Sequence, residues 1–109
     1  MATTYKVLGQ QIPAATTETT LYTVPASTQT VISSIVICNQ TATAATFRLS
    51  VRVAAAVLAA KMYIAYDVTV GASDSTVLTM GLTLGATDLL TCYSSTATTS
   101  FQAYGSEIA

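Results

Sequence analysis

The sequence predicts an all-β domain, an antiparallel β-sandwich or jelly-roll-like fold of about seven or eight short strands. Apolar and polar residues alternate with a period of two in several stretches, which indicates strands with one buried face. Clusters of Gly, Pro, Ser, Thr and Asp interrupt these stretches at intervals of roughly 8–12 residues, as turns do in such folds. The 109 residues suffice for a single hydrophobic core but not for two.

The first twenty residues differ in pattern from the rest, so we divide the chain into residues 1–20 and a β-sandwich domain over residues 21–109. Residues 3–11, TTYKVLGQQ, have the pattern of a short strand, and residues 12–20, IPAATTETT, that of a linker without periodicity. Two interpretations of residues 1–20 remain open. They form either an N-terminal arm that adds a strand to the sheet of a neighbouring subunit or the first edge strand of the same domain.

Residues 28–39, TQTVISSIVICN, are predicted to form a central strand because apolar residues occupy both of its faces. Such two-sided burial also fits a strand whose second face is covered by a neighbouring subunit. The preceding strand, residues 20–24, ends at the turn Pro25-Ala26-Ser27, since proline cannot donate to a strand ladder.

The alternation is clearest in residues 46–53, TFRLSVRV. Phe47 and Leu49 fall on the predicted core face, and Arg48 and Arg52 fall on the opposite face. The Ala-rich residues 54–60 that follow form either a short helical turn or a tight apolar linker.

Residues 61–70 are predicted to form the next strand. One of its faces is expected to hold the apolar residues Met62, Ile64, Tyr66, Val68 and Val70. We expect Tyr66 to pack in the core together with Phe47 and Phe101.

The carboxyl-terminal part of the chain is predicted as four short strands. They are residues 75–80, 81–84, 89–95 and 99–105. The turns are expected at residues 71–74, Gly81, 85–88 and 95–98, where Gly, Ser, Thr and Asp cluster.

The low charge of the chain limits the functions it can have. Charged residues make up 8% of the chain and the formal net charge is −1, so we expect no nucleic-acid partner. The absence of histidine excludes Ser-His-Asp and Cys-His catalysis and imidazole metal sites. We therefore predict that the protein is not an enzyme and has no catalytic, cofactor-binding or metal-binding residues. Asp67, Asp74 and Asp88 are interpreted as turn residues.

The sequence predicts folding in a cytoplasm without membrane insertion. The longest apolar run, residues 53–60, is far shorter than the ~20 residues that cross a bilayer, and MATTYKVLGQ lacks the pattern of a signal peptide. In a reducing cytoplasm Cys38 and Cys92 are expected to stay free, as small apolar side chains.

The surface is predicted to be suited to contacts with other proteins. Thr and Ala are abundant, and they cost less to desolvate than Lys or Glu. Arginines on an outer strand face can pair with acidic loops, and exposed tyrosines can anchor a protein interface or stack on sugar rings. The candidate interface residues are Arg48, Arg52, Tyr63, Tyr93 and Tyr104.

Five segments of the chain carry a resemblance to a known family. They are residues 5–10, 19–52, 63–70, 78–88 and 100–109, and the most specific parts are LYTVPA (21–26), CNQTATAATFR (38–48) and FQAYGSE (101–107). With these segments the chain resembles small virion structural proteins of tailed bacteriophages, including cyanophages, over nearly its whole length. None of the segments is a catalytic signature, so the resemblance implies a building block of the particle.

The resemblance implies a location in the virion, after assembly in the host cytoplasm. The implied function is that of a capsid decoration or cement protein, which stabilises the head shell through protein contacts. The alternative is a neck, baseplate or tail-fibre component with a role in adhesion to the host surface. The implied partners are further copies of the chain, as a homotrimer or other cyclic oligomer, and the major capsid protein or tail proteins.

Overall fold

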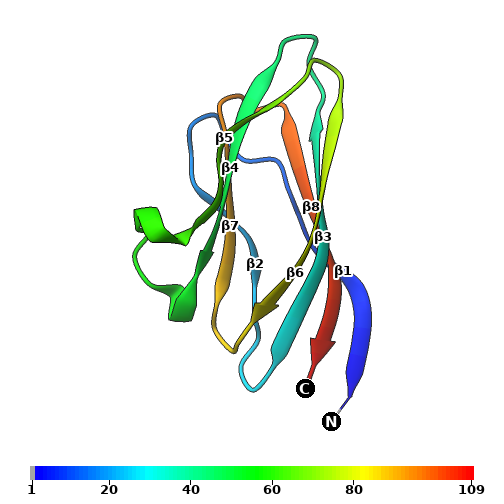
Figure 1. Ribbon diagram of the computed structural model, residues 1–109, viewed down its shortest axis with the longest axis vertical. Helices are drawn as coiled ribbons and strands as arrows, with labels where there is room; N and C mark the ends of the chain where they lie inside the picture. The colour runs from blue at the N-terminus through cyan, green and yellow to red at the C-terminus, as the bar shows by residue number, and fades with distance from the viewer. Residues whose placement is uncertain (1) are drawn as a thin grey trace.

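The computed structural model describes residues 2–109 and is an antiparallel β-sandwich of eight strands, as the sequence predicts (Figure 1). One four-stranded sheet has the order β1-β8-β3-β6 and the other the order β2-β7-β4-β5. The strands are Thr3–Gln11 (β1), Thr19–Thr23 (β2), Gln29–Asn39 (β3), Ala45–Arg52 (β4), Tyr63–Val70 (β5), Ser75–Leu84 (β6), Leu89–Ser94 (β7) and Thr99–Ile108 (β8). No helix within residues 2–109 combines the length and the apolar character that crossing a membrane requires.

The strand pairing follows the plan of a jelly roll. β1 pairs with β8, β2 with β7, β3 with β6 and β4 with β5, all antiparallel. The chain is thus one long hairpin, rolled so that successive strand pairs alternate between the two sheets. Both ends of the chain lie together in consequence, and Ala2 and Ala109 exchange two backbone hydrogen bonds of 2.8 and 2.9 Å.

The hydrophobic core lies between the two sheets and comes from alternate residues of their strands. Phe47 of β4 and Phe101 of β8 are fully buried, and their rings meet edge to face with centroids 6.1 Å apart. This confirms the core positions predicted for the two phenylalanines. The aliphatic residues that surround them include Val24, Ile32, Ile35, Ile37, Leu49, Val70, Leu84 and Leu90.

Strand β1 is the outer strand of its own chain's sheet, because it pairs with β8 from Thr3 to Gln11. Gly9 makes this position possible. A Cβ atom at Gly9 would lie only 2.1 Å from the carbonyl oxygen of Leu21, so no larger residue fits between β1 and β2.

Strand β3 is a central strand, as predicted for residues 28–39, and lies between β8 and β6. Its inward residues Ile32, Ile35 and Ile37 are fully buried. The outward residues Val36 and Cys38 are only half-buried, so the outer face of this central strand reaches the surface of the single chain.

Strand β5 departs from the predicted alternation because its pairing with β4 has a β-bulge and a second register shift, between Ala65 and Tyr63. Leu49 pairs with Ala65 and Phe47 with Val68, so β5 has one residue more than β4 between these two pairs. Asp67 lies in the bulge with a φ of 51°, a left-handed conformation that Asp tolerates better than most residues. The extra residue reverses the side to which the neighbouring stretch of side chains points.

The predicted apolar face of residues 61–70 is therefore wrong before the bulge, and beyond the bulge Val68 is still 39% exposed. Tyr66, expected in the core, is 57% exposed on the outer face, and Ile64 is exposed as well. Ala65 packs against the core instead, and Val70 beyond the bulge is buried as expected.

Two of the local predictions also need correction or refinement. Gly81 is not a turn, because β6 runs unbroken from Ser75 to Leu84 where two strands were expected. Around residues 54–60 the chain forms two separate 3₁₀ turns, Val53–Ala55 (η1) and Ala60–Met62 (η2), with a loop between them. The turns predicted at residues 71–74, 85–88 and 95–98 are confirmed.

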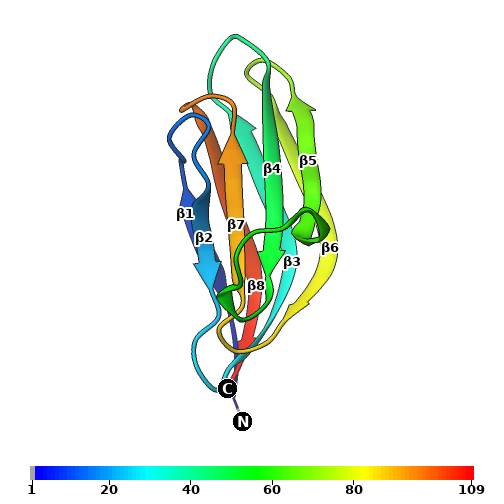
Figure 2. The same cartoon turned by 90° about the vertical axis from the view of Figure 1, so that its left-hand side faces the viewer.

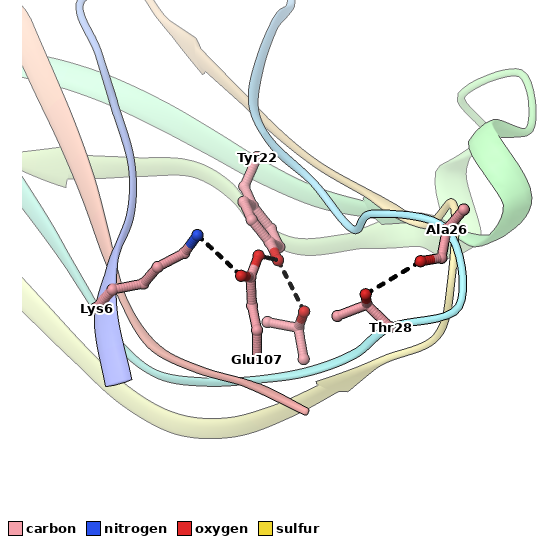
Figure 3. A network of polar contacts seen from close by, with 6 residues as sticks. Lys6, Tyr22, Ala26, Thr28 and Glu107 are labelled. Carbon is pink, nitrogen blue, oxygen red and sulfur yellow. Dashed lines mark hydrogen bonds and ion pairs between the residues drawn. The ribbon is translucent and has the colours of Figure 1, made fainter. Parts of the chain in front are cut away.

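A polar network joins the two sheets near the chain ends (Figure 3). The hydroxyl of Tyr22 on β2 donates to Oε2 of Glu107 on β8 and lies 2.8 Å from the hydroxyl of Thr30 on β3. Because a tyrosine hydroxyl has one hydrogen, the Thr30 hydroxyl is the donor in this second bond. The Nζ atom of Lys6 lies 2.8 Å from Oε1 of Glu107.

This network fixes the charge states of its members. Burial raises the pKa of Tyr22 to about 12, and the hydrogen bond to Glu107 adds to the effect. The hydrogen bonds from Lys6 and from Tyr22 lower the pKa of Glu107 below its ordinary value. Near neutral pH, Glu107 is therefore a carboxylate and Tyr22 a hydrogen-bond donor.

Candidate functional site

Arg48 is the centre of a group of side chains on the outer face of the sheet β2-β7-β4-β5, which we call the Arg48 cluster. It consists of Arg48 on β4, Tyr93 on β7, and Tyr63, Tyr66 and Asp67 on β5. Figure 2 shows these three strands side by side, with β4 in the middle.

The sheet register brings the Arg48 cluster together. Arg48 lies directly opposite Tyr93 in the β4–β7 ladder, so their side chains share one face. The bulge in β5 falls opposite Arg48 on the other side and turns Tyr66 to the outer face, where Asp67 also lies. Without the extra residue of the bulge, Tyr66 would point into the interior, as the sequence predicts.

Two kinds of contact hold the guanidinium group of Arg48. Its Nε and Nη2 atoms donate to the two carboxylate oxygens of Asp67, at 2.7 and 3.3 Å. Its Cζ atom lies 4.2 Å from the ring centroid of Tyr66 and 4.4 Å from that of Tyr93. Both distances are within the range of cation–π contacts. The planar, bidentate arrangement is one that lysine could not make.

The electrostatics of the ion pair keep both of its members charged. The hydrogen bond to Asp67 raises the pKa of Arg48 above its usual range, and the same bond lowers the pKa of Asp67. The charge of Arg48 is therefore already balanced within the chain, and the exposed pair offers a partner directed hydrogen-bonding groups with little net charge.

The tyrosines extend the cluster toward the 3₁₀ turns. The rings of Tyr63 and Tyr66 meet edge to face with centroids 4.9 Å apart. Both line a shallow hollow together with Leu58, Ala59 and Ala60. An exposed aromatic wall beside a fixed arginine has the composition of residues that dominate binding at protein interfaces, and it can also stack on a sugar ring.

The structure brings together three of the five predicted interface residues, Arg48, Tyr63 and Tyr93. Arg52 is separate, because its Nε atom donates to the Ala56 carbonyl oxygen at 2.7 Å and so holds the chain around η1. Tyr104 lies on β8 in the other sheet, where its hydroxyl donates to Gln102.

Sequence reasoning missed Tyr66 and Asp67 as members of the site. The available signal was the position of Asp67 inside an otherwise β-favouring run. Asp is unfavourable in strand interiors and tolerates left-handed backbone, so it can mark a bulge.

The outer face of the sheet β1-β8-β3-β6 is a second candidate surface, which we call the neutral face. The strands of this sheet contain two charged residues, Lys6 and Glu107, and both join the network on the inner side. Over the described residues, the neutral face therefore carries no charged side chain. Its exposed apolar residues include Tyr5, Val7 and Val77, which are 83%, 48% and 57% exposed.

The remaining candidate residues have structural positions. Asp88 accepts hydrogen bonds from the backbone N–H groups of Gly85 and Ala54, at 2.9 and 2.8 Å, and Asp74 accepts one from that of Ser75. No group of three or more Cys, Asp or Glu side chains within residues 2–109 is placed to hold a metal ion.

Cys38 and Cys92 are both free. Burial, with a smaller contribution from the charge of Glu18, raises the pKa of Cys92 to about 12. A thiol with such a pKa stays protonated near neutral pH and is a poor nucleophile.

Comparisons with known proteins found no matching family model, no matching curated protein and no matching solved structure.

Proposed function

We propose that this protein is a structural subunit of a tailed-phage virion, and that it serves as a capsid decoration or cement protein. In this function it binds the major capsid protein on the assembled head and adds contact area between capsid subunits. Further copies of the chain are its other partner.

The neutral face is the observation that carries this proposal. A protein that works alone in solution usually has charged residues on its outer sheet faces, which keep it soluble and monomeric. Here the outer face of a whole four-stranded sheet presents hydroxyl, amide and apolar side chains. Such a face is inexpensive to desolvate and suits a subunit buried in an assembly.

Two further observations support the proposal. The jelly roll is an architecture that viral capsid proteins use, although the same architecture also has other functions. The sequence segments described above resemble small virion proteins of tailed phages over most of the chain. The fold and the resemblance point in the same direction independently of the surface chemistry.

The structure changes the expected role of the arginines in this function. Arg48 is balanced by Asp67, whereas Arg52 bonds a neutral backbone carbonyl through Nε and keeps its charge, so one of the two arginines is no longer free to attract a partner. Attraction of acidic capsid loops by free arginine charges is therefore a weaker contribution than the sequence predicts. Burial of the neutral face and directed contacts by the Arg48 cluster replace it in our proposal.

The proposal is tested by counting copies in the particle. Virions of the phage that encodes this chain would be purified and their proteins quantified by mass spectrometry against the major capsid protein. We expect on the order of hundreds of copies, because a symmetric shell repeats each contact many times. Roughly a dozen copies or fewer would contradict capsid decoration, and absence from the particle would contradict any structural role in the virion.

The Arg48 cluster favours a second candidate function, adhesion to the host surface by a neck, baseplate or fibre component. Tyr63 and Tyr66 wall an exposed hollow next to fixed hydrogen-bonding groups, an arrangement that can hold a sugar ring. Recombinant protein would then bind host surface polysaccharide, and Tyr63→Ala would weaken the binding roughly tenfold or more. Tyr104→Ala, in the other sheet, is the matched control. Equal binding by both variants would remove the support for this function.

A further inference from the structure

We propose that the free edge of β6 is a self-association site. In our proposal, residues Ser75–Thr79 pair antiparallel with the same residues of a second copy of this chain, about a two-fold axis through Val77. The sheets β1-β8-β3-β6 of the two copies then join into one continuous sheet, with their neutral faces on the same side.

The edge of β6 is open and regular. β6 is the last strand of its sheet, so β3 satisfies the backbone groups on one side only. The other side presents N–H and C=O groups that can pair with another strand. From Ser75 to Thr79 the pairing of β6 with β3 has no register shift, and the irregularity comes only after Thr79. This segment is therefore a straight template for an added strand.

The other three edges carry protections that natural sheets use against such pairing. β5 has the bulge and the charge of Asp67. β2 is only 5 residues long. β1 contains Lys6 and a register shift between Val7 and Gly9. The segment Ser75–Thr79 has no charge, no proline and no bulge.

Self-complementarity makes a second copy the occupant. A two-fold axis at Val77 places Val77 opposite the partner's Val77, Thr76 opposite the partner's Leu78, and Ser75 opposite the partner's Thr79. Opposite residues in such a ladder point to the same side of the sheet. Every pair joins apolar or hydroxyl side chains, and pairs that include a β-branched residue are favourable across strands.

The side chains at this edge are incompletely covered in the single chain. Val77 is 57% exposed on the neutral face, and Leu78 on the inner side is half-buried at the rim of the core. Figure 2 shows that β5 and β6 form one long side of the sandwich, opposite β1 and β2. A second copy paired at β6 would cover both side chains.

The inference does not rest on the proposed virion function, because the pairing is a property of the chain in isolation. The oligomeric state of the pure protein tests the pairing, whereas the copy number in virions tests the function. Either can fail without the other.

The first experiment measures the mass of the full-length protein by sedimentation equilibrium over a range of concentrations. We expect a reversible dimer. Val77→Lys would place two like charges at the axis and raise the dimer dissociation constant roughly tenfold or more. Tyr5→Lys is the matched control, because it adds the same charge to the same neutral face on the opposite edge strand. Its dimer should persist. Circular dichroism and thermal unfolding would establish that both variants fold.

A second experiment tests the register. Val77→Cys would place two thiols directly opposite each other, at a separation that a disulfide can bridge. Mild oxidation should then yield a covalent dimer, whereas Tyr5→Cys should remain monomeric under the same conditions.

Several outcomes would overturn the proposal. These are a wild-type protein that stays monomeric at all concentrations, a trimer, or a dimer that Val77→Lys leaves intact while Tyr5→Lys dissociates it. Protection of the Ser75–Thr79 amides from hydrogen exchange only in virions, with a monomer in solution, would assign this edge to a strand of another protein.

Discussion

The two outer faces of the sandwich differ in whether they carry charged side chains. On the sheet β2-β7-β4-β5, Arg48 is half-buried on the outer face, bound to Asp67 and packed against two tyrosines. On the sheet β1-β8-β3-β6, Lys6 and Glu107 meet on the inner side and leave the outer face neutral. Each of the two ion pairs thus has a definite structural task, one to fix a surface cluster and the other to join the sheets.

The difference indicates two kinds of contact. A partner on the Arg48 cluster meets groups whose positions are already fixed, so little conformational entropy is lost on binding. Such a contact is dominated by a few aromatic and arginine side chains. A partner on the neutral face has no charge to desolvate but finds few strong anchors, so that contact depends on area and on strand pairing.

The largest expected effect on stability comes from the close packing of β8 against β3 in the sheet β1-β8-β3-β6. A Cβ atom at Gly105 of β8 would lie 2.0 Å from the carbonyl oxygen of Val31 on β3. Gly105→Ala should therefore lower the free energy of unfolding by about 3 kcal/mol, or prevent folding. Gly81→Ala is the control, since a Cβ atom there meets nothing within 4 Å. Urea unfolding of both variants measures the difference. Similar stabilities would mean that β8 can move away from β3 at little cost.

The sandwich and most of its turns could be predicted from the sequence, because alternation and turn composition are local properties. Phe47 is predicted in the core for this reason, and Phe101 because core packing is the common fate of an aromatic residue; both are fully buried. The jelly-roll strand order could not be derived, because it depends on which distant strands pair.

The Arg48 cluster was predicted only in part for the same physical reason. Arg48 and Tyr93 stand out in the sequence as an arginine and an aromatic residue in predicted strands, and both are half-buried on the outer face. Alternation within β5 already places Asp67 on the outer face, but the bulge that brings Tyr66 to the same face arises from the register between β4 and β5, which alternation does not reveal. The contact between Lys6 and Glu107 is equally non-local, since it joins the two ends of the chain.

The second prediction compares a tyrosine between the sheets with one on the neutral face. Tyr22→Phe removes the hydroxyl that bonds Glu107 and Thr30. We expect the free energy of unfolding to fall by about 1–2 kcal/mol, because two buried or half-buried polar groups lose a partner. Tyr104→Phe removes a hydroxyl that bonds only the neighbouring Gln102 on the outer surface. It should leave stability nearly unchanged. If chemical denaturation showed equal losses of unfolding free energy for Tyr22→Phe and Tyr104→Phe, the inter-sheet network would not stabilise the fold more than a surface hydrogen bond does.

The third prediction concerns how the free energy of unfolding changes at acidic pH. The pKa of Glu107 in the folded protein is lowered from its ordinary 4.5. Its contribution to stability is therefore complete above about pH 4.5 and is lost as the pH falls through the lower, folded pKa. Glu107→Gln should reduce stability at neutral pH and flatten the acid dependence of the unfolding free energy. Asp67→Asn should flatten it less, because Asp67 is more exposed than Glu107, 46% against 14%. A larger change for Asp67→Asn would reverse the assigned ranking of the two ion pairs.

The smallest effect on stability is expected at Arg48 itself. Arg48 and Asp67 face solvent, so Arg48→Gln should change the unfolding free energy less than Tyr22→Phe does.

The substitution Arg48→Gln should have a clear local effect, because the hydrogen bond from Arg48 is the main cause of the lowered pKa of Asp67. A carboxyl titration followed by NMR should show this pKa rise toward its ordinary value of 3.8. Arg52→Gln is the control and should leave the Asp67 titration unchanged, because Arg52 bonds the Ala56 carbonyl instead. If the Asp67 pKa were the same in all three proteins, the Arg48 cluster would not be fixed in solution, and its advantage as a preformed contact would be lost.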